Sequence, residues 1–296
     1  MDTMKLRVHS SHDIFNHTKH NVTVDEDKMV NSWFLMSNPG PMLTVLAVYL
    51  LFVLKIGPRF MSSRKPFQLK TIMMFYNVFQ IFCNSYIVIA FLLHTEGHQY
   101  LLKHGCQPAD MDSNVLRIDM CVGYWRYTIM KFIDLIDTVF FVLRKKNSHM
   151  TFLHVYHHCG MALFSWCCLK YFRGEQGVLL GVMNCLVHVI MYTYYFLAGL
   201  GEEMRKRLWW KKYITTIQMG QFCIGLVYIG SLIAFGCNLP KGFSLFWAFN
   251  LVIFLALFLN FYNRTYSRKP SDAKTVAPTP TPTQPDTEKT DKQKVN

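Results

Sequence analysis

The sequence predicts an all-α polytopic membrane protein with seven transmembrane helices. The 296 residues are 51% hydrophobic and only 17% charged, whereas about a quarter of the residues in soluble domains are charged. Apolar runs long enough to cross a bilayer occur seven times. The formal net charge is +13, but a disordered or nucleic-acid-binding protein would not combine that excess with so apolar a chain. The nine cysteines are spread through apolar runs, which argues against a small disulfide scaffold.

The apolar runs place the spans in chain order. The expected spans are Met42–Leu54, Thr71–Leu93, Cys121–Leu143, Thr151–Leu169, Gly177–Ala198, Tyr213–Phe235 and Phe243–Tyr262. The first is short, so we expect the flanking Trp33–Met36 to complete its crossing. The membrane domain then covers residues 34–268. It is preceded by a polar segment, residues 1–33, that lacks the apolar core of a signal peptide. Residues 269–296 hold the run Pro278-Thr-Pro-Thr-Pro, which predicts a disordered tail.

Basic residues predict the orientation of the spans. They gather in the loops after spans one, three and five: Lys55, Arg59, Arg64, Lys65, Lys70, Arg144, Lys145, Lys146, Arg205, Lys206, Arg207, Lys211 and Lys212. Because cytosolic loops carry the excess of Lys and Arg, the N-terminus is expected in a lumen and the C-terminus in the cytosol.

Two kinds of short sequence signal agree with this orientation. Asn16 and Asn21 each begin a glycosylation sequon that would face the lumen, whereas the sequon at Asn263 would face the cytosol and stay unmodified. The ending Lys292-Gln-Lys-Val-Asn matches the cytosolic dilysine pattern for retrieval to the endoplasmic reticulum.

Two cysteines stand apart from the others. Cys106 and Cys237 fall in luminal loops, and the lumen is an oxidising compartment. We therefore expect a disulfide between them. The cysteines within spans are expected to pack as small apolar residues.

Ionisable residues inside the spans point to a functional site, because they are costly in a membrane. Lys131, Asp134 and Asp137 are spaced three apart in the third span, with Thr138 beside them, so a cation and two carboxylates share one helical face. The structural alternative is a self-compensating Lys–Asp pair that holds the bundle together.

The fourth span opens with three histidines on one side of a helix, His154, His157 and His158. Three imidazoles this close are difficult to explain by packing. Imidazole can serve as a metal ligand, a general base or a nucleophile toward an acyl group.

Two further spans carry polar stripes. The fifth has Asn184, His188 and Tyr192, and the sixth has Thr215, Gln218 and Gln221. For the sixth, interhelical hydrogen bonding explains the pattern as well as a site does.

These groups lie in the cytosolic half of the predicted bundle, below a basic rim. Apolar walls beneath a cationic mouth suit a substrate with an anionic head and a long apolar tail, such as an acyl-coenzyme A. Arg144, Lys211 and Lys212 are candidates for contacting its phosphates, although the positive-inside rule alone also explains them.

Two other protein classes fit less well. Membrane di-iron desaturases use several histidine boxes, but the second box-like pair, His94 and His98, lies at the opposite, luminal end of span two. A seven-span receptor is disfavoured because no proline falls inside spans two to seven. The residues thus disfavour a metal site.

At these residues the sequence resembles the ELO family of very-long-chain fatty acid elongases, the 3-ketoacyl-coenzyme A synthases, over roughly residues 33–269. The motifs that carry the resemblance are Gly57-Pro-Arg-Phe-Met, Arg64-Lys-Pro-Phe, Lys131-x-x-Asp134-x-x-Asp137-Thr138-x-Phe140, Phe141-Val-Leu-Arg-Lys-Lys-Asn, Thr151-Phe-Leu-His-Val-Tyr-His-His, Asn184-x-x-x-His188-x-x-Met191-Tyr192-x-Tyr194-Tyr195 and Thr215-x-x-Gln218-x-x-Gln221-Phe222. One departure is Asp134, where the family usually has Glu.

The resemblance implies a fold and a reaction. Six of the seven helices would form an inverted barrel of two three-helix units around an acyl tunnel. An acyl-coenzyme A and malonyl-coenzyme A would condense, with loss of carbon dioxide and coenzyme A, to a 3-ketoacyl-coenzyme A two carbons longer. The partners implied are the lipid bilayer and the ketoacyl reductase, dehydratase and enoyl reductase of the elongation cycle, but no nucleic acid. The resemblance implies neither a metal nor a redox cofactor. A homo-oligomer is compatible with the resemblance.

Together the residues and the resemblance give each candidate a role. His157 is expected to attack the thioester and to hold the acyl group, while His188 and Asn184 stabilise the charge that develops. Asp137 is expected to orient His154 or His158. The remaining substrate-binding candidates are Lys131, Asp134, Tyr192, Gln218 and Gln221. Bulky residues are expected to close the tunnel floor, with Phe222, Tyr228, Phe235 and Trp247 as candidates.

Overall fold

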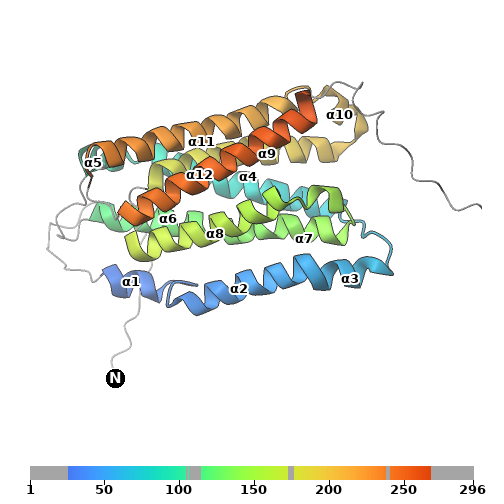
Figure 1. Ribbon diagram of the computed structural model, residues 1–296, viewed down its shortest axis with the longest axis horizontal. Coiled ribbons are helices and arrows are strands. Elements are labelled where there is room, and N and C mark those ends of the chain that lie inside the picture. The colour runs from blue at the N-terminus through green and yellow to red at the C-terminus, as the bar shows by residue number, and fades with distance from the viewer. Residues whose placement is uncertain (1–25, 105, 107–114, 173–176, 238–240, 268–296) are drawn as a thin grey trace, which may run out of the picture.

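The computed structural model describes residues 26–104, 106, 115–172, 177–237 and 241–267 as an elongated helical bundle (Figure 1). The helices are α1 (Glu26–Ser32), α2 (Pro39–Leu51), α3 (Gly57–Ser62), α4 (Lys70–Leu93), α5 (Thr95–His104), α6 (Val115–Ile133), α7 (Leu135–Leu143), α8 (Phe152–Phe172), α9 (Val178–Leu200), α10 (Glu202–Arg207), α11 (Lys211–Ala234) and α12 (Lys241–Tyr262). The bundle has an α5 end, where α1 also lies, and an α10 end, where α3 lies (Figure 1).

Six long helical units close a ring of contacts. α4 packs against α9, α9 against α11, α11 against α12, α12 against α8, α8 against α6, and α6 against α4. α2 and α3 lie outside this ring, on α8 and α7. Polar side chains that point inward from the ring therefore face one another rather than the surroundings.

The first predicted span is extended at its C-terminal end, whereas residues 33–36 were expected to extend it at its N-terminal end. α2 continues through a π-helical turn, Phe52–Ile56, into α3, and together they make a segment of 24 residues. Residues 33–36 lie outside this helix, and Trp33 instead stacks on Trp125 with ring centroids 5.7 Å apart. The π turn accommodates Pro58, which has no N–H for a regular helix. A Cβ on Gly57 would lie 2.6 Å from the Val142 side chain, so only glycine lets α3 approach α7 this closely.

The third predicted span is two helices that meet at Asp134. The Asp134 N–H donates to the Met130 carbonyl over 2.9 Å, and the Asp134 carbonyl accepts from the Asp137 N–H over 3.2 Å. The second bond is the tighter i→i+3 type that is common where one helix ends and the next begins. The interruption brings the Asp134 side chain to the inside of the bundle.

Five of the described segments are long and apolar enough to cross a membrane: Pro39–Ser62, Lys70–Leu93, Val178–Leu200, Lys211–Ala234 and Lys241–Tyr266. The protein is therefore a polytopic membrane protein. The two other predicted spans correspond to α6–α7 and α8. The break at Asp134 and the histidines of α8 lower their apolar character, although both run through the same ring.

Aromatic residues and a disulfide close the α5 end. Phe243 stacks on Phe164 and on Phe172, with ring centroids 5.3 Å and 4.0 Å apart. Cys106 and Cys237 form a disulfide, the pair that the sequence analysis names. Asn16 and Asn21 and the tail from residue 269 lie outside the described residues.

Candidate active site

The centre of the bundle holds an ion pair shielded from its surroundings. Lys131 on α6 and Asp134 at the α6–α7 break are only 2% and 3% exposed, and the lysine Nζ lies 2.8 Å from Asp134 Oδ2. Lys131 Nζ also lies 5.1 Å from the centre of the Tyr127 ring, in a cation–π contact. Two charges in so apolar a place persist only when further polar partners complete their shells.

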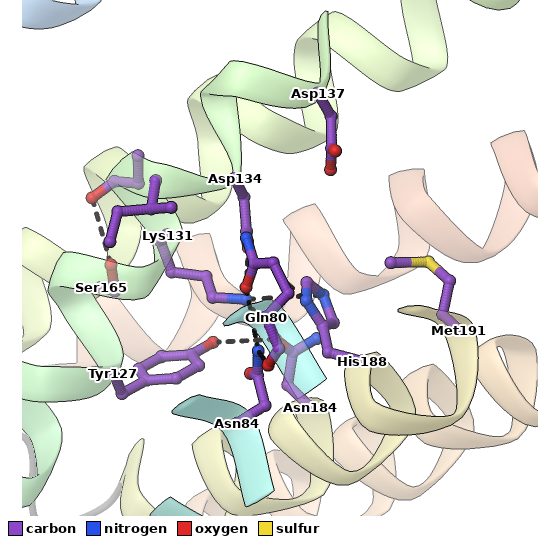
Figure 2. Close-up of polar contacts among 12 residues, drawn as sticks. Gln80, Asn84, Tyr127, Lys131, Asp134, Asp137, Ser165, Asn184, His188 and Met191 are labelled. Atoms are coloured by element: carbon purple, nitrogen blue, oxygen red, sulfur yellow. Dashed lines mark hydrogen bonds and ion pairs between the residues drawn. The ribbon is translucent and has the colours of Figure 1, made fainter. Parts of the chain in front are cut away.

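Helix α9 supplies two of these partners. Lys131 Nζ donates to Asn184 Oδ1 over 2.8 Å and lies 3.5 Å from His188 Nε2 (Figure 2). An ammonium group can only donate, so Nε2 is the acceptor and the ring proton belongs on Nδ1. His188 Nδ1 lies 3.6 Å from Asp134 Oδ2, so its proton is on the side of this carboxylate. We call Lys131, Asp134, Asn184 and His188 the central cluster.

Helix α4 supplies partners that the sequence analysis missed. Gln80 Nε2 donates to Asp134 Oδ1 over 2.8 Å, and Asn84 Nδ2 donates to Gln80 Oε1 over 3.1 Å. Asn77, Gln80 and Asn84 are all buried. Their spacing of three and four residues within an apolar span was the signal that could have revealed this polar face of α4.

The structure corrects the role predicted for Asp137. Asp137 Oδ2 accepts a hydrogen bond from the Tyr192 hydroxyl over 2.6 Å, and Tyr192 also lies 3.3 Å from Asp134 Oδ1. The side chain beside His154 is Thr138, whose Oγ1 lies 3.1 Å from His154 Nε2 and accepts from the Tyr49 hydroxyl over 2.8 Å. Adjacent residues of a helix point in different directions, so Thr138 faces α8 while Asp137 faces α9.

The three histidines of α8, which we call the histidine box, lie close together. The His154 and His158 rings have centroids 4.3 Å apart, and the His157 and His158 rings 5.6 Å. His157 otherwise packs edge-on against Phe254 and Phe258 of α12, at 5.1 Å and 6.2 Å. Among the described residues no polar partner is recorded for its two ring nitrogens, so a lone pair is available for chemistry.

Next to the box, a cavity of about 390 Å³ opens between α6, α8, α9, α11 and α12. Asn184, Gln221 and the Tyr156–Asn250 pair, joined by a 2.8 Å hydrogen bond, add polar groups to a mainly apolar wall. The wall also includes Phe254, on which His157 packs. The box therefore stands beside one end of a cavity that extends toward the α5 end.

The other predicted residues of α11 and α12 divide into two groups. Gln221, Phe222 and Trp247 line the cavity, whereas Gln218 Nε2 only approaches Met191 Sδ at 3.6 Å. Phe235 is 81% exposed, and neither it nor Tyr228 is part of the wall. Phe222 and Trp247 are thus the two predicted floor residues that the fold brings to the cavity.

Basic residues surround the α10 end. His149 follows α7 and stacks on Phe141 at 5.4 Å. Partial burial lowers the pKa of His149, and the nearby charges of Lys146, Lys211 and Arg144 lower it further. Residues from two separate loops therefore share one positive field. Lys212 contributes less directly, because its Nζ lies over the Tyr213 ring at 5.0 Å.

Within the described ranges, no three His, Cys, Asp or Glu side chains are grouped as ligands for a metal ion. His94 accepts a hydrogen bond from the Gly97 N–H through Nδ1, and His98 packs on Phe91 at 4.6 Å. His94 follows α4 and His98 lies in α5, whereas the histidine box lies in the first turns of α8.

Comparisons with known proteins give the family of this chain. The profile of the ELO: GNS1/SUR4 family matches residues 34–274. Very long chain fatty acid elongase 7 of Rattus norvegicus is 41% identical over 208 residues, which is 70% of this chain and 73% of the relative. Elongase 4 of Macaca mulatta is 39% identical over 217 residues, 73% of this chain and 68% of the relative. Elongase 1 of Mus musculus is 35% identical over 239 residues, 80% of this chain and 85% of the relative.

The family match covers α2 to α12 and includes every helix that contributes to the central cluster and to the histidine box. The chain therefore belongs to the ELO family of very-long-chain fatty acid elongases, multi-pass membrane acyltransferases that are 3-oxoacyl-coenzyme A synthases.

Proposed function

We propose that this chain condenses a long-chain acyl-coenzyme A with malonyl-coenzyme A through an acyl group carried on His157. The observation that supports this role most directly is the position of His157. It packs on Phe254, which lines the mainly apolar cavity, and neither of its ring nitrogens is engaged among the described residues. A nucleophile needs such an unengaged lone pair.

The first half of the reaction transfers the acyl group to the protein. The His157 nitrogen attacks the thioester carbonyl, a C–N bond forms, and the C–S bond breaks. The departing thiolate takes the proton of the resulting imidazolium and leaves as coenzyme A. The acyl chain occupies the cavity beside α12 during this step, and the coenzyme A phosphates lie against the basic residues of the α10 end.

The second half forms the new carbon–carbon bond. Malonyl-coenzyme A loses its carboxylate as carbon dioxide, and the electron pair of that bond becomes an enolate carbon that attacks the acyl carbonyl. The C–N bond to His157 breaks, and the imidazole recovers one proton from water. The product is a 3-ketoacyl-coenzyme A two carbons longer.

The central cluster supplies donors for the negative oxygen that forms in both halves. The Asn184 carbonyl oxygen faces Lys131, so its amide NH₂ remains as a donor at the cavity wall. Lys131 fixes this amide from behind, because its three N–H groups face Asp134, Asn184 and His188. His188 accepts a hydrogen bond through Nε2 in this arrangement, so we assign it the role of holding Lys131 rather than that of an oxyanion donor. Donors already fixed before the reaction lower its barrier most.

We further propose that all seven predicted segments cross the endoplasmic reticulum membrane, with the α5 end in the lumen. The six units of the ring then form an inverted barrel, because α4, α6–α7 and α8 alternate in direction oppositely to α9, α11 and α12. The disulfide at the α5 end, the basic α10 end and the dilysine ending all support this orientation.

Trapping the acyl-enzyme tests the proposal. Purified protein is incubated with a long-chain acyl-coenzyme A alone, quenched and digested, and the peptide that contains residues 152–158 is sequenced by mass spectrometry. We expect a mass increase equal to the acyl group on His157, lost when malonyl-coenzyme A is added before the quench. An adduct on another residue, or a rapid reaction with no adduct at all, would contradict the nucleophile assignment.

A second experiment tests whether the cavity holds the acyl chain. A Cβ on Gly225 would lie 3.1 Å from Leu251 Cδ1 at the cavity wall, whereas a Cβ on Gly230 of the same helix meets no atom within 4 Å. Gly225→Leu should therefore shift the longest product to a shorter chain, and Gly230→Leu should leave the product profile unchanged. Equal profiles for both variants would show that the chain lies elsewhere.

A further inference from the structure

A second cavity lies near the α5 end, on the other side of α6 from the cavity proposed to hold the acyl chain. It has a volume of about 210 Å³ and lies between α4, α5, α6 and α9. Most of its wall is apolar, including Ile87, Phe91 and Val182, and its polar side chains are few. The two cavities share only Tyr124, Tyr127 and Gly181, so these residues form the partition between them.

Arg126 of α6 lines this second cavity and forms no ion pair with a described residue. Its guanidinium donates to the Tyr86 hydroxyl over 3.1 Å and lies 5.4 Å from the centre of that ring. Among the described residues no carboxylate is within 4.0 Å of it. The carboxylates of the same span are engaged elsewhere, Asp134 with Lys131 and Asp137 with Tyr192.

The depth of Arg126 in the bundle makes a guanidinium without a described ion-pair partner unusual. Tyr86 lies seven residues before the end of α4, so this contact is about 10 Å inside that end at 1.5 Å per residue. Arg126 is nevertheless exposed. A cation at such a depth in a spanning segment is costly unless it pairs with an anion or reaches the interface.

The rim of the cavity does not supply this anion. Asp119 is the carboxylate nearest along α6, seven residues or about two helical turns from Arg126, and its Oδ2 lies 3.6 Å from His94 Nε2. His94 Nδ1 accepts from the Gly97 N–H over 3.0 Å, so in the neutral ring the proton is on Nε2, directed toward Asp119. Asp119 therefore contacts His94 at the rim, and within the described ranges it forms no ion pair with Arg126.

We propose that this second cavity binds an anionic membrane lipid, with Arg126 as the anchor for its headgroup. A guanidinium presents a planar pair of donors that matches phosphate and carboxylate oxygens. The Tyr86 hydroxyl, which accepts from Arg126, has its own proton left to donate to the same headgroup. The apolar wall then covers part of the lipid chain. This site is separate from the proposed acyl cavity and does not depend on the reaction assigned to it.

The test measures lipid retention by the full-length protein with native mass spectrometry from detergent. Three lipids are added in turn: dioleoyl phosphatidylglycerol, dioleoyl phosphatidylcholine and oleate. We expect the wild type to retain the anionic phospholipid in preference to the zwitterionic one that has the same chains. Arg126→Gln should lower the bound fraction about tenfold, the effect of losing one charge-assisted contact.

Ala90→Trp tests the cavity without changing a charge. Ala90 is exposed and lines the cavity, while its neighbour Ile89 is exposed and does not. Ala90→Trp should reduce retention, and Ile89→Trp should not. Arg59→Gln, at the opposite end of the bundle, serves as the charge control.

Each outcome decides the proposal. If the protein retains oleate but not phosphatidylglycerol, the site binds a free carboxylate. If it retains phosphatidylglycerol but not oleate, the site binds a phospholipid phosphate. In both cases retention must fall in Arg126→Gln and in Ala90→Trp. Equal retention of the two phospholipids would overturn the proposal. Wild-type retention by Arg126→Gln and by Ala90→Trp would do so as well.

Discussion

The central cluster and the histidine box lie in neighbouring helices but are built in opposite ways. In the central cluster, Lys131 and Asp134 hold each other, Asn184 of α9 holds Lys131, and Gln80 of α4 holds Asp134, each at 2.8 Å. In the box, His157 contacts two phenylalanine rings and one other imidazole. Preorganised electrostatics require fixed groups, whereas a nucleophile requires a free lone pair. The contrast matches a division of labour between stabilising charge and carrying the acyl group.

Breaking the central ion pair should have the largest effect. Lys131→Met leaves the Asp134 carboxylate buried without its cation, which costs about 3–5 kcal/mol of stability. We expect a large fall in the thermal unfolding temperature of the detergent-purified protein, together with loss of condensation activity.

Two further variants show whether the loss of stability comes from the unpaired charge. The double variant Lys131→Met/Asp134→Asn removes both charges but keeps an oxygen that can accept from Gln80, so it should recover much of the stability and none of the activity. Lys206→Met breaks an exposed pair with Glu203, 3.2 Å long, and should change stability by no more than about 0.5 kcal/mol. If the double variant is as unstable as the single one, then lost packing explains the effect and the charge does not.

Removing the proposed nucleophile should separate activity from stability. His157→Ala is expected to lower the condensation rate by a factor of about 10²–10⁴, in the range of losing a positioned catalytic imidazole, with little change in unfolding temperature because no hydrogen bond is lost. His149→Ala, outside the bundle core, is the control and should keep most of its activity. A near wild-type condensation rate for His157→Ala would show that the histidine box serves helix packing and not catalysis.

The departure at Asp134 offers a third test. Asp134→Glu restores the residue usual in the family but adds a methylene to a site where Lys131 and Gln80 already contact the shorter carboxylate at 2.8 Å. Overpacking of this kind costs about 1–3 kcal/mol, so stability should fall while activity drops less than tenfold. Asp119 of α6 has a side chain that is 55% exposed, so Asp119→Glu should leave the unfolding temperature unchanged. Higher stability for Asp134→Glu would show that the longer side chain fits and that α6–α7 tolerates a different break.

The helix positions were largely predictable, because apolar periodicity reports burial in a bilayer directly. Thr71–Leu93 was expected where α4 spans Lys70–Leu93, and Gly177–Ala198 where α9 spans Val178–Leu200. The first span was wrong in how it is completed. Residues 33–36 were expected to extend it, but a π turn carries the segment past Leu54 to Ser62 instead.

The site was predictable as a set of residues but not as a set of contacts. Spacing shows which residues share one helical face, and it placed Asn184 and His188 together correctly. It does not show which neighbouring helix meets that face. For this reason Asp137 was assigned to a histidine although it bonds Tyr192, and the amides of α4 were overlooked although Gln80 bonds Asp134.

The smallest expected effect concerns Thr138, which links α7 to the box through a polar contact with His154. Thr138→Val keeps the side-chain shape but removes the hydroxyl that lies 3.1 Å from His154 Nε2 and 2.8 Å from the Tyr49 hydroxyl. Losing such a bond costs about 1 kcal/mol, so we expect kcat to fall about three- to tenfold with KM unchanged, since Thr138 positions an imidazole and does not touch the substrate. Thr128→Val is matched, because Thr128 donates to the Tyr124 carbonyl within α6 over 2.9 Å and has no contact with the box; its kcat should stay at the wild-type value. Equal kcat values for the two valine variants would mean that His154 needs no orientation from α7, and the box would then act through His157 alone.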